Sequence, residues 1–237
     1  MLTKNKSRLP IANKLLAALS QTEYRRVMAN LVPVELHADK TLYESGDTIK
    51  YVYFPNDALI SMQTMVDQRH SLEVGIVGRE GMIGIMVAMG ISVAPNRAVV
   101  QCSGSAMRMN AAAFRKEFRL GQSMQREIHL FTRTLMIQMA QTAACNRFHS
   151  VEERLARRFL MTRDRLGSDH FSLTHEFLGD MLGIRRVGVT KAAYQLKQRK
   201  LIDYSRGNVA ILNVRGLQAS ACSCYEVTHA KDIHGKA

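Results

Sequence analysis

The stretch from Pro33 to Met109 constrains the fold most, because short apolar runs alternate there with turn signals and no helical periodicity intervenes. The apolar runs are Val34–His37, Tyr51–Phe54, Ala58–Met62, Leu72–Val77 and Ala98–Cys102. Turn residues separate them, as in Glu44–Asp47, Pro55–Asp57 and Ser103–Gly104. Many short strands in succession are typical of an antiparallel β-barrel or jelly roll. We therefore expect an α+β protein that contains such a roll.

Helical periodicity flanks this β region on both sides. Two short amphipathic helices are predicted before it, over Ile11 to Leu19 and Thr22 to Leu31. After it, apolar residues recur at alternating steps of four and three, at Met124, Ile128, Phe131, Leu135 and Met139. This spacing indicates a coiled-coil seam. Two interpretations are open: the helix lies on its own barrel, or it pairs with its twin in a dimer.

A helix-turn-helix motif is predicted for the segment 174–196. Thr174 is a good N-cap, Gly179 lets a second helix cross closely, and Gly183 supplies a turn residue that can adopt positive φ. The apolar faces of the two helices are Phe177, Leu178, Met181 and Leu182, then Val189, Ala192, Ala193 and Leu196. The alternative is an ordinary helical hairpin with a solvated basic face. A capping-box spacing of Ser150 and Glu153 starts another helix upstream and places a hinge at 148–150.

The second helix of this motif is the predicted reader of DNA. The segment 201–212 predicts two strands around a turn at Arg206, which would form a wing. The predicted DNA contacts are Arg185, Arg186, Val187, Gly188, Thr190, Lys191, Lys197 and Arg206. Arg186 and Lys191 are assigned to base edges, whereas Arg185, Thr190, Lys197 and Arg206 are assigned to the phosphate backbone. A dimer would read an approximate inverted repeat, so we prefer the dimer interpretation of the seam.

The charge balance points to the same partner. Lys and Arg outnumber Asp and Glu by 33 to 20, which gives a formal charge of +13 and favours a polyanion such as nucleic acid. The longest apolar run, 81–91, is too short for a membrane span, and no uninterrupted signal-peptide core follows the N-terminal charges. We expect a cytoplasmic protein with no membrane partner. Four cysteines are few for a secreted disulfide scaffold, so reduced thiols are expected.

A roll, a long heptad helix, a hinge and a winged helix-turn-helix in this order resemble the Crp/Fnr family of transcription regulators. The most specific residues are 173–202, and the segment 77–84 is similar to the effector-loop region of the family. The resemblance implies three parts: an effector-type β-roll with N-terminal helices over 1–120, a dimerisation helix and hinge over 121–149, and a DNA-binding domain over 150–237. It implies a homodimer, with RNA polymerase as a further partner. An enzyme is not expected, because the sequence lacks a recognisable set of acid, base and nucleophile.

The resemblance also implies an effector site in the roll. Its matching residues are Glu80, Gly81, Met82, Gly84, Arg97, Ala98 and Met139. In members of the family that bind cyclic AMP, a Glu holds the ribose and an Arg followed by Ser or Thr holds the phosphate, but here Met82 and Ala98 stand at two of those places. An unmodified cyclic AMP response is therefore not expected, and the effector is unknown. No cysteine precedes Cys102, so the N-terminal iron–sulfur cluster of other members is not expected either.

Two weaker features and one competing function complete the interpretation. Cys222 and Cys224, followed by His229 and His234, are ligands of zinc-binding type, but their irregular spacing favours an ordinary terminus, so no metal site is predicted. Cys145 lies beside the hinge and is interpreted as a buried small residue. The competing function is a small-molecule-binding signalling module that docks on an acidic protein or membrane surface. Binding unaffected by Arg186→Ala and Lys191→Ala would favour that alternative.

Overall fold

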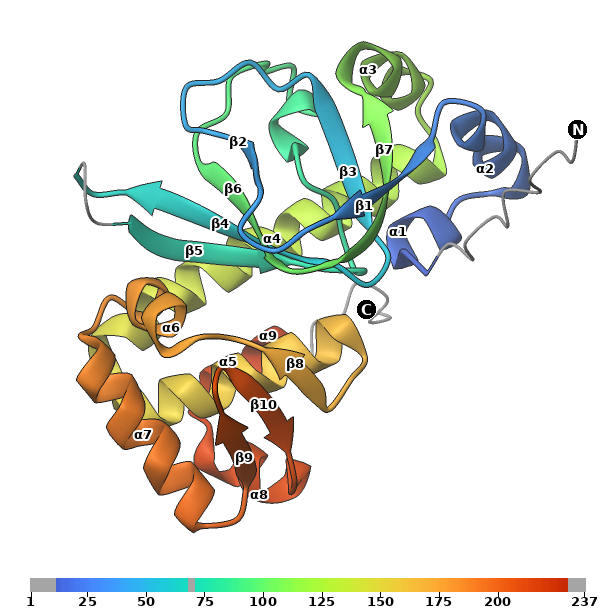
Figure 1. The fold of residues 1–237 in the computed structure, drawn as a ribbon. Helices are drawn as coiled ribbons and strands as arrows, with labels where there is room; N and C mark the ends of the chain where they lie inside the picture. Colours follow the sequence, from blue (N-terminus) through green and yellow to red (C-terminus); the bar gives the residue numbers. More distant parts are fainter. Residues whose placement is uncertain (1–11, 68–70, 230–237) are drawn as a thin grey trace, which may run out of the picture.

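The computed structural model describes residues 12–67 and 71–229. Figure 1 shows two bodies, an N-terminal β-roll flanked by helices and a C-terminal domain of helices with a small sheet, joined by the long helix α4. The elements of the first body are α1 (Lys14–Ala17), α2 (Gln21–Met28), β1 (Val32–Leu36), β2 (Thr41–Tyr43), β3 (Tyr51–Pro55), β4 (Leu59–Met65), β5 (Ser71–Val77), the 3₁₀ turn η1 (Ile85–Val87), β6 (Arg97–Cys102), β7 (Gly104–Asn110), α3 (Ala111–Arg119) and α4 (Ser123–Phe148). Those of the second are α5 (Val151–Leu166), β8 (His170–Ser172), α6 (His175–Leu182), α7 (Arg186–Gln198), β9 (Ile202–Ser205), β10 (Asn208–Ile211), α8 (Val214–Ser220) and α9 (Cys224–His229).

The predicted α+β class and the β-roll are confirmed. The roll consists of one sheet in the order β1-β7-β3 and another in the order β2-β6-β4-β5, with antiparallel pairing throughout. Strands β2 and β7 were not predicted. Strand β7 is buried for most of its length but is built from small residues and methionines rather than β-branched ones, so it carries little strand signal. A Cβ on Gly104 would lie 2.6 Å from the backbone nitrogen of Ala58, which explains the glycine at the start of β7.

The seam of α4 packs on the roll of its own chain. Met124, Ile128, Phe131 and Leu135 are at most 4% exposed and belong to the same apolar core as the strands. Met139 is half-buried and packs against that core. The preferred prediction, that these residues form the dimer interface, is wrong for the four buried positions, because their side chains are already covered within one chain. The alternative interpretation, in which the helix lies on its own barrel, is correct for these four residues.

The second body has its own apolar core, and α5 attaches it to the roll. The capping box predicted for Ser150 and Glu153 is present, since the Glu153 carboxylate accepts from Ser150 N at 2.8 Å and the Ser150 hydroxyl accepts from Glu153 N at 3.3 Å. Further along α5, Arg158 forms a buried ion pair with Glu73 of β5, with Arg158 Nη2 donating to Glu73 Oε2 at 3.0 Å. Both side chains are less than 10% exposed. A buried, hydrogen-bonded charge pair therefore joins the two bodies.

Within the described ranges, no helix combines the length and the apolar composition that crossing a membrane requires.

Candidate nucleic-acid interface

The first helix of the motif, α6, has the predicted caps. The Thr174 hydroxyl accepts from Phe177 N at 3.2 Å, and Gly183 ends the helix with φ of 61°. A Cβ on Gly179 would lie 3.0 Å from the carbonyl oxygen of Ile184, which is closer than a side chain normally approaches. The two glycines thus serve different purposes: Gly183 permits left-handed backbone, and Gly179 permits the close crossing of α7.

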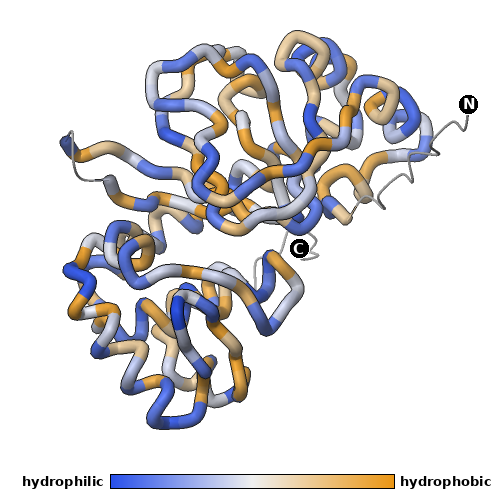
Figure 2. Tube along the Cα trace, in the orientation of Figure 1, coloured by the Kyte–Doolittle hydropathy of each residue, from blue (hydrophilic) through white to orange (hydrophobic). Residues whose placement is uncertain are grey.

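The second helix, α7, divides into an inward and an outward side. Val189, Ala192, Ala193 and Leu196 are at most 3% exposed and pack into the core of the C-terminal domain. Figure 2 shows hydrophilic and hydrophobic residues alternating along α7, and Figure 1 places the helix along the outer edge of the domain. The inward stripe holds the helix by apolar burial, which leaves its outward side free to contact another molecule.

Most predicted DNA contacts lie on that outward side. Arg185, Arg186, Val187, Thr190 and Lys191 are all exposed, and Val187 retains 72% of its accessible surface. Burial of the Arg185 and Arg186 guanidinium groups in the protein interior would have excluded DNA contact. Both side chains are exposed instead. Gly188 is partly exposed. Helix α7 contains no Asp or Glu, so its outward side is uniformly cationic or neutral.

Two of the predicted phosphate contacts already have protein partners. Lys197 Nζ lies 2.7 Å from a carboxylate oxygen of Asp203 on β9, and this ion pair lowers the pKa of the Asp203 carboxyl. The Thr190 hydroxyl donates to Arg186 O at 3.0 Å and lies 3.1 Å from His175 Nδ1. Lys197 therefore presents a charge that Asp203 partly neutralises, which sequence spacing did not reveal.

His175 and Tyr204 join the start of α6 to the wing. Their rings stack with centroids 4.4 Å apart and planes within 8°. Burial, followed by the nearby Arg186 charge, lowers the pKa of the His175 imidazole. Burial raises the pKa of the Tyr204 phenol to about 12, and this hydroxyl donates to Leu173 O. The neutral ring pair thus braces the helix-turn-helix against the sheet.

The wing is present with the predicted turn. Strands β9 and β10 pair so that Asn208 faces Ser205, which leaves Arg206 and Gly207 as a two-residue loop. Both have positive φ, of 50° and 84°, as a type I′ turn requires. Arg206 is exposed at the tip. Strand β8, which was not predicted, pairs with β10 and extends the wing to a three-stranded sheet.

Sequence reasoning missed Tyr194 as a candidate contact. This side chain is 62% exposed and follows Thr190 by four residues and Lys191 by three, so it shares their face of α7. An aromatic ring with a hydroxyl can contact bases or phosphate. The sequence did contain a signal for this contact, because Tyr194 is not part of the inward apolar stripe to which Ala193 and Leu196 belong.

The predicted effector residues are committed to protein contacts. Arg165 of α5 forms an ion pair of 2.8 Å with Glu80, and Arg97 pairs with Glu44 at 3.2 Å. Met82 and Ala98 are fully buried in the core of the roll. A Cβ on Gly81 would overlap the Phe131 ring, Gly84 packs near Val52 with φ of 93°, and Met139 lies over Gly75. Of the predicted effector residues, Glu80 and Arg97 thus have charged partners within the chain, whereas Met82 and Ala98 are buried.

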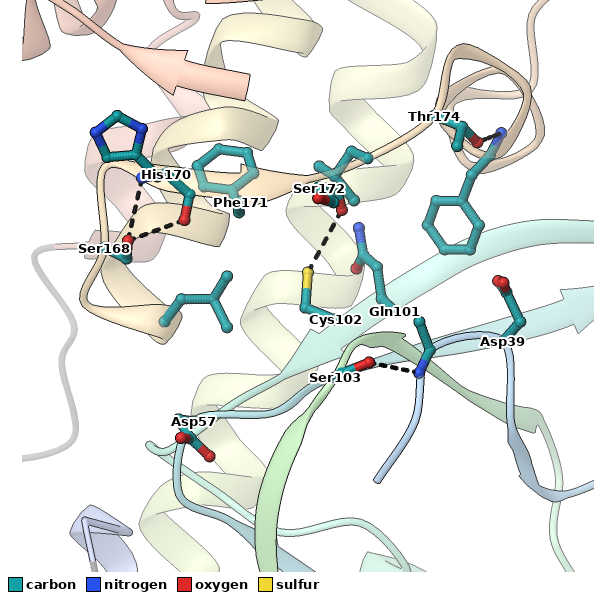
Figure 3. A pocket seen from close by; sticks show the side chains of 14 residues that line it. Asp39, Asp57, Gln101, Cys102, Ser103, Ser168, His170, Phe171, Ser172 and Thr174 are labelled. Atoms are coloured by element: carbon teal, nitrogen blue, oxygen red, sulfur yellow. Dashed lines mark hydrogen bonds between the residues drawn. The ribbon is translucent and has the colours of Figure 1, made fainter. Parts of the chain in front are cut away.

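A cavity of about 490 Å³ lies elsewhere, between the roll and the C-terminal domain (Figure 3). It is lined on one side by the loops that carry Asp39, Asp57 and Ser103, and on the other by β8. Cys102 spans the junction, with its thiol donating to Ser172 O at 3.8 Å. The lining is mixed, with polar side chains at the rim and Phe171 and Phe177 on the domain side.

Comparison with known proteins agrees with this geometry. The family model of the Crp-like helix-turn-helix domain matches residues 153–220. No curated protein sequence matches the chain. The structure of FixK2 from Bradyrhizobium japonicum aligns with a TM-score of 0.70 at 14% identity, covering 81% of this chain and 98% of that one. A transcriptional regulator of the CRP family from Thermus thermophilus aligns with a TM-score of 0.66 at 18% identity, covering 82% and 99%.

A further similar structure is the c-di-GMP responsive global regulator CLP of Xanthomonas campestris, with a TM-score of 0.65 at 13% identity, covering 81% of this chain and 99% of that one. The resemblance inferred from the sequence is confirmed. Residues 153–220 form a Crp-like helix-turn-helix domain, in a chain with the fold of the Crp/Fnr family of transcription regulators.

Proposed function

We propose that the protein is a sequence-specific transcription regulator that binds an inverted-repeat operator as a homodimer. The observation that carries this proposal is the outward side of α7, which is exposed, basic and free of acidic residues. A helix with such a face, held by apolar burial on its other side, fits the major groove of DNA. The cytoplasm is the proposed location, since that is where a bacterial regulator meets its operator.

The contacts are divided by chemistry. Arg186 and Lys191 carry donors for base edges, and Val187 offers an apolar surface that suits a thymine methyl group. Arg185, Thr190 and Arg206 contact the phosphate backbone, and Lys197 does so in competition with Asp203. Gly188 leaves room for close approach of the groove wall. Tyr194 extends the contacting face by one helical turn.

The proposed dimer uses the side of α4 opposite the buried seam. Met136 is 65% exposed, and Ala140 and Ala143 are exposed on the same side of the helix. Small residues beside a methionine allow two helices to approach closely in an apolar contact. The division into a roll over 1–120, a dimerisation helix and hinge over 121–149 and a DNA-binding domain over 150–237 belongs to this proposal. RNA polymerase is the partner through which such a dimer would act on transcription.

Control by a small effector inside the roll is not part of the proposal. Gly81 is covered by Phe131, and Met82 and Ala98 are buried without polar groups to offer a ligand. The Glu80 carboxylate is held by Arg165 of the C-terminal domain.

The test is selection of genomic fragments by the purified protein, followed by measurement of affinity against salt concentration. We expect a recovered inverted repeat and a steep linear fall of log affinity with log salt. Arg186→Ala and Lys191→Ala should each weaken operator binding by about 1–3 kcal/mol, or roughly 5- to 150-fold. Arg119→Ala, which removes an exposed arginine from the roll, is the matched control. A flat salt response, or no effect of either α7 substitution, would favour docking on an acidic protein or membrane instead.

A further inference from the structure

Four metal-ligand side chains from two distant segments meet beside the hinge. They are Cys145 in the last turn of α4, His149 directly after that helix, Cys222 just before α9 and Cys224 at the first position of α9. Their ligand atoms all lie within 4.8 Å of one another. Cys145 Sγ is 3.4 Å from Cys222 Sγ, and Cys224 Sγ is 3.5 Å from His149 Nδ1. Sequence spacing did not predict this group, because 77 positions separate Cys145 from Cys222.

The local structure presents these ligands together. Cys145 lies in the last turn of α4, and His149 is the residue that ends the helix, with its backbone N–H donating to Cys145 O at 3.2 Å. The three sulfurs belong to residues that are at most 4% exposed, and they form a small cluster of their own. His229 belongs to α9 but its side chain is not described, and His234 lies outside the described residues. The histidine of the described group is His149, which the sequence analysis did not consider as a ligand.

Two separations within the group are close to those around one tetrahedral ion. Zinc–sulfur bonds of about 2.3 Å and zinc–nitrogen bonds of about 2.0–2.1 Å place two sulfurs about 3.8 Å apart, and sulfur and nitrogen about 3.6 Å apart. The observed separations of 3.4 Å and 3.5 Å need only small adjustments to reach those values. Three cysteines and one histidine are also a complete ligand set for structural zinc, with no position left for water.

The surroundings favour a negatively charged centre. Three thiolates around a divalent cation carry a net charge of −1, which needs compensation in a buried place. Arg154 and Arg157 of α5 are 7% and 5% exposed and line the same small cavity as Cys145. Their described hydrogen bonds go to neutral oxygens, those of Asn146 and Leu182 for Arg154 and of Thr142 for Arg157. Neither guanidinium group has a carboxylate partner among the described residues, so metal-bound thiolates beside them would supply the compensating negative charge.

A neighbouring amide completes the environment. Gln141 Nε2 lies 2.9 Å from Cys224 Sγ and can donate to it. Donors of this kind orient the ligands of a metal and stabilise their charge.

We propose that Cys145, His149, Cys222 and Cys224 bind one zinc ion that clamps α9 of the DNA-binding domain to the end of the long helix α4. The metal would span the junction at 149–150, so it would limit how far the two bodies move relative to each other. The inference concerns metal binding alone and does not rest on the proposed operator or dimer.

The test uses the full chain and measures metal content directly. Purified protein equilibrated with Zn²⁺ and then gel-filtered should retain about one metal ion per chain by mass spectrometry, as a closed Cys₃His site requires. Co²⁺ in place of Zn²⁺ should give the visible absorption of a tetrahedral thiolate complex. Cys222→Ser and Cys224→Ser should lose most of the bound metal. Cys102→Ser and His129→Ala are matched controls, because the first thiol is outside the group and the second imidazole is exposed on α4.

A second measurement covers the case in which a cluster variant fails to fold. In the natural sequence, Zn²⁺ should protect Cys145, Cys222 and Cys224 from alkylation, whereas Cys102 should react at an unchanged rate. Equal metal content in the cluster variants and the controls would overturn the proposal. So would reduced protein that retains no metal, in particular if mild oxidation then yields a Cys145–Cys222 disulfide.

Discussion

At the scale of single residues, the two glycines of the motif show what local sequence can predict. The left-handed backbone at Gly183 and the close approach at Gly179 are conditions that only glycine meets at low cost, so their positions mark the turn and the crossing. The environment of His175, in contrast, could not be predicted from its neighbours in the sequence. It depends on Tyr204, Thr190 and Arg186, which come from other elements.

His175 makes folding stability depend on pH. Its folded-state pKa is lowered by burial and by Arg186, so the unfolded chain takes up the proton first as pH falls. The contribution is therefore complete above the unfolded value of about 6.5 and decreases below it. We expect the Tm to fall more steeply between about pH 7 and pH 5.5 in the natural chain than in His175→Gln. Parallel pH profiles of the two proteins would contradict this expectation.

At the scale of elements, the ion pair between α7 and β9 tunes the charge offered to DNA. Asp203→Asn frees Lys197 from its partner and removes a negative charge close to the phosphates. Operator affinity should rise, and the slope of log affinity against log salt should steepen by about one. Asp180→Asn, an equal change of net charge at an exposed site on α6, should have a smaller effect. If Asp203→Asn raises operator affinity equally in a Lys197→Ala background, the ion pair between Lys197 and Asp203 is not the cause of the gain.

The two sides of α4 make separable predictions. Met136→Glu places a charge on the exposed side and should weaken self-association at least about tenfold, since a buried charge is costly at an apolar contact. Phe131→Ala should instead lower the free energy of unfolding by about 3–5 kcal/mol, because it leaves a cavity between α4 and the roll. Sedimentation and urea unfolding measure the two effects. Met89→Glu is the control for an exposed methionine elsewhere, and equal dissociation by both Glu variants would refute the proposed dimer face.

At the scale of the whole molecule, the buried pair of Arg158 and Glu73 joins the two bodies. Arg158→Met should lower the free energy of unfolding by about 3–5 kcal/mol, because it leaves the Glu73 carboxylate buried without its partner. Adding Glu73→Gln should recover most of the loss, since it removes the unpaired buried charge and the Ser61 hydroxyl can still donate to the side-chain oxygen at position 73. Arg163→Met, which breaks a surface pair, should cost at most about 1 kcal/mol. A similar cost for Arg158→Met would mean that this junction is not held by the pair.

The sequence by itself determined the order of the elements, the roll, the capping box, the wing turn and the outward face of α7. These follow from periodicity, turn chemistry and capping, which act between neighbours in the chain. The short strands β2 and β8 escaped prediction because each has only 3 residues, too few to show alternation.

The tertiary structure alone decided what covers each face. Periodicity identified the apolar seam of α4 correctly, but its covering is the roll of the same chain rather than a partner. In the same way, Glu80 contacts Arg165 instead of an effector, and Cys145 meets Cys222 across the fold. The physical reason is common to all three. A residue pattern determines which side chains leave water, whereas the groups they meet come from distant segments that only the packed chain brings together.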